Sequence, residues 1–359
     1  MPACYSCLEG LLICEAQIIT TRGLHWQYKH NPTGEPLIKL AIDKKAIYVI
    51  LLTLLRFSAD ILDISNWLVA IGDYDAALVR AVFMKYACIT MDVESDITST
   101  RPEIELFSDE EKLENFGRLC NEKSIPLTAF LVTKLLDQAP NLIEKACSVL
   151  PIKFEVHSHS HDQSQPDSER EIDASVGQYS RFFGNPPKGY RAPNGLITPG
   201  GLKRLADRGF SYDSSIFPSI RFDEYGYNHL SCPIRPYVYQ TPGEILEVPM
   251  GVVKGVRLVI SLSFVKLFGP GFYKVLIGIF GLPDVVTLLS HPYDFTLPSH
   301  LHRIKGWKRY AHARNAREAA HCFVTIVDYL RSKGYQFVYI DDMIEALDRS
   351  ALPRIDAQS

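Results

Sequence analysis

Short apolar runs rich in β-branched and aromatic residues recur from residue 86 onward, and helical patterns lie between them. The runs that read as strands are Tyr86–Met91, Leu127–Val132, Phe154–Val156, Gly189–Arg191, Phe210–Tyr212, Ile245–Val248, Val285–Leu289 and Gln336–Ile340. Strands that alternate with helices predict a mainly parallel sheet, because parallel neighbours need a long crossover connection. Seven or eight such units predict an α/β fold of barrel type over residues 86–350.

Two of the intervening segments carry clear helical signals. Ser108 followed by Glu111 forms a capping box, in which the two side chains satisfy free backbone N–H groups at a helix start. Arg314–Lys333 places apolar residues at helical spacing and is followed by Gly334, a typical helix stop. Residues 1–85 lack this rhythm, so we expect an appended, mainly helical N-terminal segment. Residues 351–359 are expected to form a tail.

The composition is that of an ordinary globular chain. With 359 residues, a formal net charge of -3 and a pI near 6.4, the sequence offers no basic surface, which excludes a nucleic-acid partner. The eight cysteines are scattered, and Cys4-x-x-Cys7 with Cys14 lacks a fourth zinc ligand, so we expect reduced thiols. The N-terminus has no basic n-region and Glu15 interrupts its apolar stretch, which predicts no cleavable signal peptide and a cytoplasmic location.

Two apolar stretches raise the question of a membrane span. Ala46–Leu55 is too short for a bilayer core of roughly 30 Å. Leu258–Leu282 is longer, but two lysines and Gly269-Pro270 interrupt it, so we expect a pair of helices in an apolar insertion at about 251–283. Two interpretations stay open for residues 258–282. The helices pack on the core, or they form a surface that contacts a membrane or a lipid-linked substrate.

Charged and reactive residues follow five of the predicted strands. In parallel α/β folds the carboxyl ends of the strands meet at one edge, where chemistry collects. We therefore expect these residues to lie on one rim. The five strand ends are Asp92-Val93-Glu94-Ser95-Asp96, His157-Ser158-His159-Ser160-His161, Arg191-Ala192-Pro193-Asn194-Gly195, Asp213-Ser214-Ser215 and Ser290-His291-Pro292-Tyr293-Asp294.

The histidine cluster indicates a metal site. If the residues after the strand turn into helix, His157 and His161 stand at i and i+4 on one face, with ring nitrogens able to converge on one ion. Two histidines make only half of such a site. A third ligand must come from another strand end, and a catalytic metal also needs an open position for water or substrate.

Taken in order, the five motifs resemble those of the polysaccharide deacetylases, the carbohydrate esterase family four or NodB homology group. The resemblance covers roughly residues 86–348 and implies a distorted (β/α)7-8 barrel of the polysaccharide deacetylase type. It implies that His157, His161 and an acidic residue of the first motif bind the metal. It also implies that Asp92 is the general base that deprotonates the attacking water.

The remaining roles also follow from the resemblance. A backbone N–H of the Arg191–Gly195 loop, that of Asn194, would hold the tetrahedral oxyanion together with the metal. His291 would protonate the departing amine. Asp213 would pair with Arg191 to orient the base.

Three details depart from the family pattern or need a choice. The second acidic residue is Glu94, two positions after Asp92 rather than adjacent to it; alternate positions of an extended strand share a face, so both can point into the site. We favour Glu94 as the metal ligand, with Asp96 as the alternative. Asn194 replaces a common aromatic residue, which keeps the backbone donor but loses a wall for the sugar ring. His159 is expected to point away from the metal.

These observations predict a metal-dependent hydrolase that removes an N-acyl group from an amino sugar of a polysaccharide or glycan precursor. N-acetyl is the favoured acyl group. The ligand set suits zinc, and cobalt or nickel could substitute. One alternative is cleavage of another C–N bond on the same scaffold, such as deformylation of a lipid-linked sugar. A second is a catalytically silent carbohydrate-binding relative, which would fail to bind metal.

Overall fold

The structure is a computed structural model that describes residues 24–30, 36–42, 84–96, 99, 101–222, 226–240, 243–296 and 301–356. The chain divides into two compact units, Met1–Ala76 and Ala77–Ser359. The described part of the first unit is a pair of antiparallel strands, β1 (Leu24–His30) and β2 (Pro36–Ile42). The sequence did not predict this pair. The helices expected in residues 1–85, Cys4, Cys7, Cys14 and the apolar stretch 46–55 lie outside the described residues.

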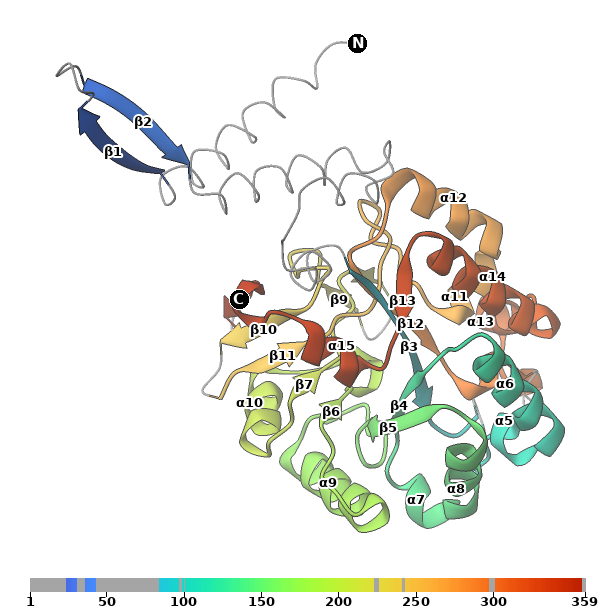
Figure 1. The fold of residues 1–359 in the computed structure, drawn as a ribbon. Helices are drawn as coiled ribbons and strands as arrows, with labels where there is room; N and C mark the ends of the chain where they lie inside the picture. Colours follow the sequence, from blue (N-terminus) through green and yellow to red (C-terminus); the bar gives the residue numbers. More distant parts are fainter. Residues whose placement is uncertain are drawn as a thin grey trace. The chain divides into compact units, whose positions relative to one another are not determined.

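The second unit is built on one curled, mostly parallel sheet (Figure 1). The strands follow the order β12-β3-β4-β5-β6-β7-β11-β10-β14, and β13 also pairs with β3. The pairing of β10 with β11 is antiparallel. The strands are β3 (Lys85–Val93), β4 (Leu127–Leu131), β5 (Ile152–Val156), β6 (Gly189–Tyr190), β7 (Tyr212–Asp213), β10 (Tyr237–Gln240), β11 (Ile245–Glu247), β12 (Val285–Ser290), β13 (Tyr335–Phe337) and β14 (Arg354–Asp356). The predicted distorted α/β barrel is confirmed. A separate small pair is formed by β8 (Ile220–Arg221) and β9 (Tyr227–Asn228).

Helices connect the strands, and Figure 1 shows α6, α8, α9 and α10 around the outside of the curled sheet. The helices are α5 (Glu105–Ser108), α6 (Glu110–Glu122), α7 (Leu135–Gln138), α8 (Pro140–Val149), α9 (Glu169–Phe183), α10 (Pro199–Asp207), α11 (Leu262–Phe268), α12 (Pro270–Phe280), α13 (Gly306–Ala313), α14 (Ala319–Ser332) and α15 (Ile340–Ala346). Helix α6 buries Leu113, Phe116 and Cys120, which lie on one face because their spacing follows the helical period. The alternation read from the sequence therefore reflects one apolar stripe per helix facing the sheet.

Strand β3 lies second in the sheet order and pairs with β12, β4 and β13. All of its residues after Lys85 are buried, as expected for a parallel strand covered on both faces. It pairs in parallel with β12 on one side and β4 on the other, and β4 pairs in parallel with β5. Because these strands run the same way, the residues that follow them meet at one edge of the sheet.

Residues 250–261 run beside the outer edge of β12. Leu289 N–H donates to Ile260 O over 3.1 Å, and Gly251 N–H donates to Thr287 Oγ1 over 2.7 Å. A Cβ atom at Gly251 would lie 2.1 Å from Thr287 O, so only glycine allows this close approach. This segment leads directly into α11 and places the apolar insertion next to the strand that precedes His291.

Three local predictions were wrong in detail. Ser108 does not cap α6, because it is the last residue of α5; the cap is Asp109, whose carboxylate accepts Lys112 N–H over 3.1 Å. The strand predicted to reach Ile340 ends at Phe337, since Ile340 begins α15. The predicted tail contains β14, which pairs in parallel with β10 and extends the sheet.

The apolar insertion forms α11 and α12, as predicted. Among the described residues no single helix is long and apolar enough to cross a membrane; α11 and α12 pass that test only as a pair, and they are bent by 103°. The bend falls at Gly269, where φ is 91°. Both helices pack on α14.

Candidate active site

Three side chains from two strand ends form a group with metal-ligand chemistry. Glu94 follows β3, while His157 and His161 follow β5, and one ligand atom from each lies within 4.8 Å of the others. The closest contact joins His161 Nε2 and Glu94 Oε2 at 2.8 Å. Two ligand atoms that each bind one zinc ion at about 2.1 Å lie at most roughly 4.2 Å from each other. A small inward movement of these side chains would therefore let all three bind one ion. The donors are of the imidazole and carboxylate type that zinc accepts.

His157 is oriented by the backbone of β6 and the loop after it. Its Nδ1 lies 2.8 Å from Arg191 O, a partner that can only accept, so Nδ1 carries the proton and Nε2 presents its lone pair. Burial lowers the pKa of His157 to about 4, despite the neighbouring carboxylates Asp92 and Glu94. The ring is therefore neutral at physiological pH, which is the form that binds a metal.

His161 reaches the same place by a loop and not by a helix. Ser158 and His161 have φ values of 57° and 60°, in the left-handed region, and His161 N–H donates to Ser158 Oγ over 3.1 Å. The two histidine rings lie 5.1 Å apart. The predicted helical i, i+4 arrangement was wrong, since the tight turn brings the rings together. Burial would raise the pKa of Glu94, but the hydrogen bond from His161 and the nearby imidazoles lower it to about 2.

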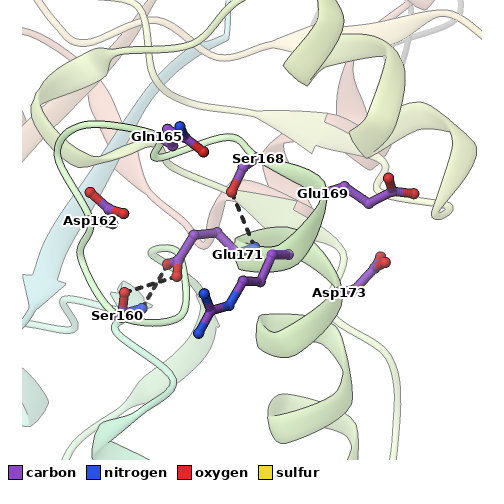
Figure 2. Close-up of a pocket in the computed structure, with 8 residues that line it drawn as sticks. Ser160, Asp162, Gln165, Ser168, Glu169, Glu171 and Asp173 are labelled. Atoms are coloured by element: carbon purple, nitrogen blue, oxygen red, sulfur yellow. Dashed lines mark hydrogen bonds between the residues drawn. The ribbon is translucent and has the colours of Figure 1, made fainter.

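Glu171 holds the histidine loop from the next helix. Its Oε2 accepts Ser160 N–H over 2.8 Å and His159 N–H over 3.2 Å, and its Oε1 accepts the Ser160 hydroxyl over 2.8 Å. Figure 2 shows the Glu171 carboxylate directed at Ser160 in a polar hollow beside α9. None of the proposed ligands or catalytic groups lines this hollow. His159 Nδ1 contacts Thr133 Oγ1 at 3.1 Å and takes no part in the metal-ligand group, as predicted.

Asp92 forms a buried ion pair with Arg191. The two side chains are 8% and 1% exposed, and Arg191 Nη1 lies 2.6 Å from Asp92 Oδ1. The same nitrogen donates to Thr90 Oγ1 over 3.1 Å, and the guanidinium carbon lies 3.9 Å from the centre of the Phe130 ring. Arg191 Nε donates to the carbonyl oxygen of Ser214, and Arg191 Nη2 donates to its hydroxyl oxygen. Asp92 therefore has a fixed orientation at the end of β3.

The predicted pairing of Arg191 with Asp213 was wrong. Asp213 instead lies against Glu247, its paired residue on the neighbouring strand β11, and both carboxyl groups are fully buried. Burial raises the pKa of Asp213 to about 6 and that of Glu247 well above its usual range, so the pair holds a proton near neutral pH. Asp213 also accepts the Ser215 hydroxyl over 2.7 Å.

That serine connects Asp213 to the loop after β6. Ser215 Oγ accepts Ala192 N–H over 2.8 Å. Asn194 has φ 56°, a left-handed conformation that asparagine tolerates better than bulkier residues. A Cβ atom at Gly195 would lie 2.7 Å from Ser215 O, so the loop packs tightly. Asp213 thus supports the loop that carries the proposed oxyanion donor.

His291 is held at the opposite side of the site. Its backbone N–H donates to Asp294 Oδ2 over 2.9 Å, and its Nδ1 lies 3.3 Å from the same oxygen, which leaves Nε2 toward Glu94 at 4.0 Å. Burial opposes the charged ring, but Asp294, Asp92 and Glu94 together raise the pKa of His291. The ring stacks on Tyr293 at 4.6 Å between centres. Tyr293 in turn donates its hydroxyl to Glu94 Oε1 over 3.2 Å.

Asp294 is itself paired with a buried lysine of the apolar insertion. Lys266 Nζ lies 3.0 Å from Asp294 Oδ1 and donates to Asp294 O over 2.9 Å, and the two side chains are 1% and 0% exposed. Ser263 also donates to Asp294 Oδ1 over 2.7 Å. Burial alone would raise the pKa of Asp294, but Lys266 and His291 lower it well below the usual range. Helix α11 therefore positions the residue that orients His291.

Asp96, the alternative ligand, has a different role. Its Oδ2 accepts Glu105 N–H over 2.7 Å at the start of α5, and it is absent from the metal-ligand group. Sequence reasoning placed Tyr293, Asp294 and Ser214 at the strand ends but gave no role to them or to Lys266. The first two lie two and three residues after His291, and Ser214 follows Asp213, so their proximity to the motifs was a usable signal. Lys266 gave a weaker one, as a charge within an apolar run.

Comparison with known families supports the assignment of this domain. Residues 99–212 match the polysaccharide deacetylase family model. The matched region contains His157, His161, Arg191 and Asn194 and ends before the strand of His291. The match confirms the resemblance to the polysaccharide deacetylases over residues 99–212, a stretch that begins after Asp92 and Glu94 and ends before Asp213. Polysaccharide deacetylases hydrolyse carbon–nitrogen bonds other than peptide bonds in carbohydrates, and the matched stretch is similar to them.

No curated protein matches the sequence. Among solved structures, a protein of Mycobacterium smegmatis assigned to the polysaccharide deacetylases is 16% identical, covers 76% of this chain and 93% of its own, and has a TM-score of 0.48. A family 4 carbohydrate esterase from Bacillus anthracis is 14% identical, covers 74% and 84%, and has a TM-score of 0.41. The polysaccharide deacetylase Bc1974 from Bacillus cereus is 12% identical, covers 71% and 91%, and has a TM-score of 0.40.

Proposed function

We propose that this chain is a metal-dependent hydrolase that removes an N-acetyl or related N-acyl group from an amino sugar of a polysaccharide or glycan precursor. The observation that carries the proposal is the meeting of three groups at one sheet edge. They are the Glu94, His157 and His161 donors, the Asp92–Arg191 ion pair, and His291. Together they provide metal ligands, a base and an acid.

Glu94, His157 and His161 would hold a divalent metal. The mixed nitrogen and oxygen donors suit zinc, with cobalt or nickel able to substitute. When bound there, the metal would supply a Lewis acid that lowers the pKa of water and polarises the acyl carbonyl. The neutral tautomer of His157, fixed by Arg191 O, is the feature of this chain that prepares the site for it.

The protein's own groups would carry the proton transfers. Asp92 would take a proton from the water that attacks the acyl carbon, while Arg191 keeps its carboxylate in place. Asn194 N–H would donate to the developing oxyanion. His291 would give a proton to the nitrogen as the C–N bond breaks, from the Nε2 that Asp294 leaves turned toward the site. The products are a carboxylate and a free amine.

The test measures metal content and acetate release from N-acetylated chito-oligosaccharides. We expect Asp92→Asn to bind metal normally and to lose about 10²- to 10⁴-fold in kcat, the usual contribution of a general base. A His157→Ala/His161→Ala variant should lose the metal. Full activity in Asp92→Asn, or unchanged metal content in the double variant, would contradict the proposal. A folded protein that binds metal under no condition would favour the silent carbohydrate-binding alternative.

A second candidate is hydrolysis of another C–N bond, such as a formamide on a lipid-linked sugar. The observation that favours it is the apolar insertion, because α11 both exposes phenylalanines and contacts Asp294 beside His291. Parallel assays of formate and acetate release, from soluble and from lipid-linked N-acyl amino sugars, distinguish the two. Release of formate alone from the lipid-linked compound would replace the first proposal by the second.

A further inference from the structure

The helices α11 and α12 expose a row of large apolar side chains. Ile279 is 67% exposed and Val275 60%, which is unusual for residues of a helix that is apolar almost throughout. Monomeric soluble proteins seldom leave large contiguous apolar patches uncovered. The apolar face, as we name this set, consists of Val256, Phe264, Phe268, Phe272, Val275, Ile279 and Phe280.

The apolar face is continuous across the bend between the helices. The Phe264 and Phe268 rings of α11 lie 6.2 Å apart, and Phe268 lies 5.5 Å from Phe272 of α12. Phe272, Val275 and Ile279 follow the helical period and share one side of α12. Phe280 continues the row to the 254–257 loop, since a Cβ atom at Gly255 would lie 3.0 Å from its ring.

The other side of these helices is fixed to the core. Tyr273 and Ile277 are buried, and the Tyr273 hydroxyl donates to Val259 O over 2.6 Å. Lys266 forms the buried ion pair with Asp294, and Asn315 Nδ2 donates to Lys266 O over 2.7 Å. The residues of the apolar face are therefore exposed in the folded protein, because the opposite side of both helices packs against the core.

Within the apolar insertion the charged residues have one sign, and the first acidic residue after it is Asp284. The segment 251–283 contains four basic residues and no acidic residue. Lys266 is buried, whereas Lys254 and Lys274 are exposed. An apolar helix face with exposed lysines and no acidic residues is the pattern of helices that lie in the interface of an anionic bilayer.

We propose that the apolar face of α11 and α12 docks on the surface of an anionic phospholipid bilayer, with Lys254 beside the headgroups. The bend of 103° prevents the pair from spanning as one straight helix and suits a shallow insertion. The docked helix α11 also carries Lys266, so the active-site edge near His291 would lie close to the membrane. This contact goes beyond the proposed hydrolysis and does not depend on it.

The test is co-sedimentation of the purified full chain with vesicles of phosphatidylcholine, with and without phosphatidylglycerol. We expect binding only when phosphatidylglycerol is present, and weaker binding as salt is raised. Phe272→Ser/Ile279→Ser should weaken binding at least about tenfold, since two apolar side chains no longer enter the lipid. Lys254→Gln should weaken it about fivefold. All three side chains are exposed, so these variants should fold.

Phe222→Ser is the matched control, because Phe222 is 91% exposed and lies outside α11 and α12. It should bind vesicles like the parent protein. His157→Ala/His161→Ala should also bind normally, which separates this proposal from the proposed hydrolysis. Unchanged binding in Phe272→Ser/Ile279→Ser would overturn the proposal. The proposal would also be overturned if the parent protein formed a stable dimer, bound no vesicles, and became monomeric in Phe272→Ser/Ile279→Ser. The apolar face would then contact a second copy of the chain.

Discussion

The two sides of the candidate active site are held in different ways. On the metal side, His161 is fixed by Ser158 within the same loop, and Glu171 of the following helix holds Ser160. On the acid side, His291 is fixed by Asp294, whose carboxylate depends on Lys266 of the apolar insertion. Contacts within the histidine loop and with the helix after it hold His161, while His157 is oriented by Arg191 O. The second side relies on a buried lysine from α11 of the apolar insertion.

This difference matters because a buried ion pair is costly to break. Removing one partner leaves the other charge without compensation in a site with no access to water. The acid side is therefore coupled to the stability of the insertion, while the metal side can be altered with less effect on the fold. The variants below change one side at a time.

The largest effect is expected on the metal side, from Glu94→Ala. Loss of this carboxylate should empty the metal site and lower kcat/KM by at least about 10³-fold, because base and acid are left without the metal. Metal content by elemental analysis and acetate release are the measurements. Asp96→Ala is the matched control: it should keep the metal and lose only about 1 kcal/mol of stability, since Asp96 accepts a helix N–H. If Asp96→Ala empties the site instead, Asp96 is the ligand.

On the acid side, Lys266→Met should destabilise the protein by about 3 kcal/mol, because it strands the Asp294 carboxylate in the core. Denaturant unfolding measures this change. The double variant Lys266→Met/Asp294→Asn should recover part of the loss, since neither group is then charged. A double variant less stable than Lys266→Met would show that the ion pair is not the source of the effect.

The pH dependence of activity tests how Asp294 acts on His291. An acid must carry its proton, so activity is present below the pKa of His291 and is lost as pH rises through it. Asp294→Asn removes contributions that raise this pKa, and it should move the alkaline limb of the kcat profile to lower pH. We expect about a tenfold loss of kcat at neutral pH, with metal content unchanged. An unshifted limb with lower activity would mean that Asp294 only supports the fold.

The same contrast explains what the sequence could predict. Five motifs at strand ends were enough to place Asp92, Glu94, His157, His161 and His291 at one edge, because parallel strands end on the same side. The loop conformation at Ser158 and His161 could not be predicted, since positive φ values there depend on the contacts of that loop. The partners of Asp213 depended on the register between β7 and β11, which periodicity alone does not give. The strand pair in the first unit had no clear pattern in the sequence.

The smallest effect is expected for His159, the middle member of the histidine cluster. Its side chain contacts Thr133 Oγ1 and lies outside the metal-ligand group, so His159→Ala should keep the metal and change kcat by less than about threefold. Stability should fall by about 1 kcal/mol, the value of one hydrogen bond. Elemental analysis and unfolding curves, run beside His161→Ala as the contrasting variant, check both points. Loss of metal in His159→Ala to the extent seen in His161→Ala would show that the loop rearranges around the ion. The contacts of the histidine loop with Ser158 and Glu171 would then not be what positions the metal ligands.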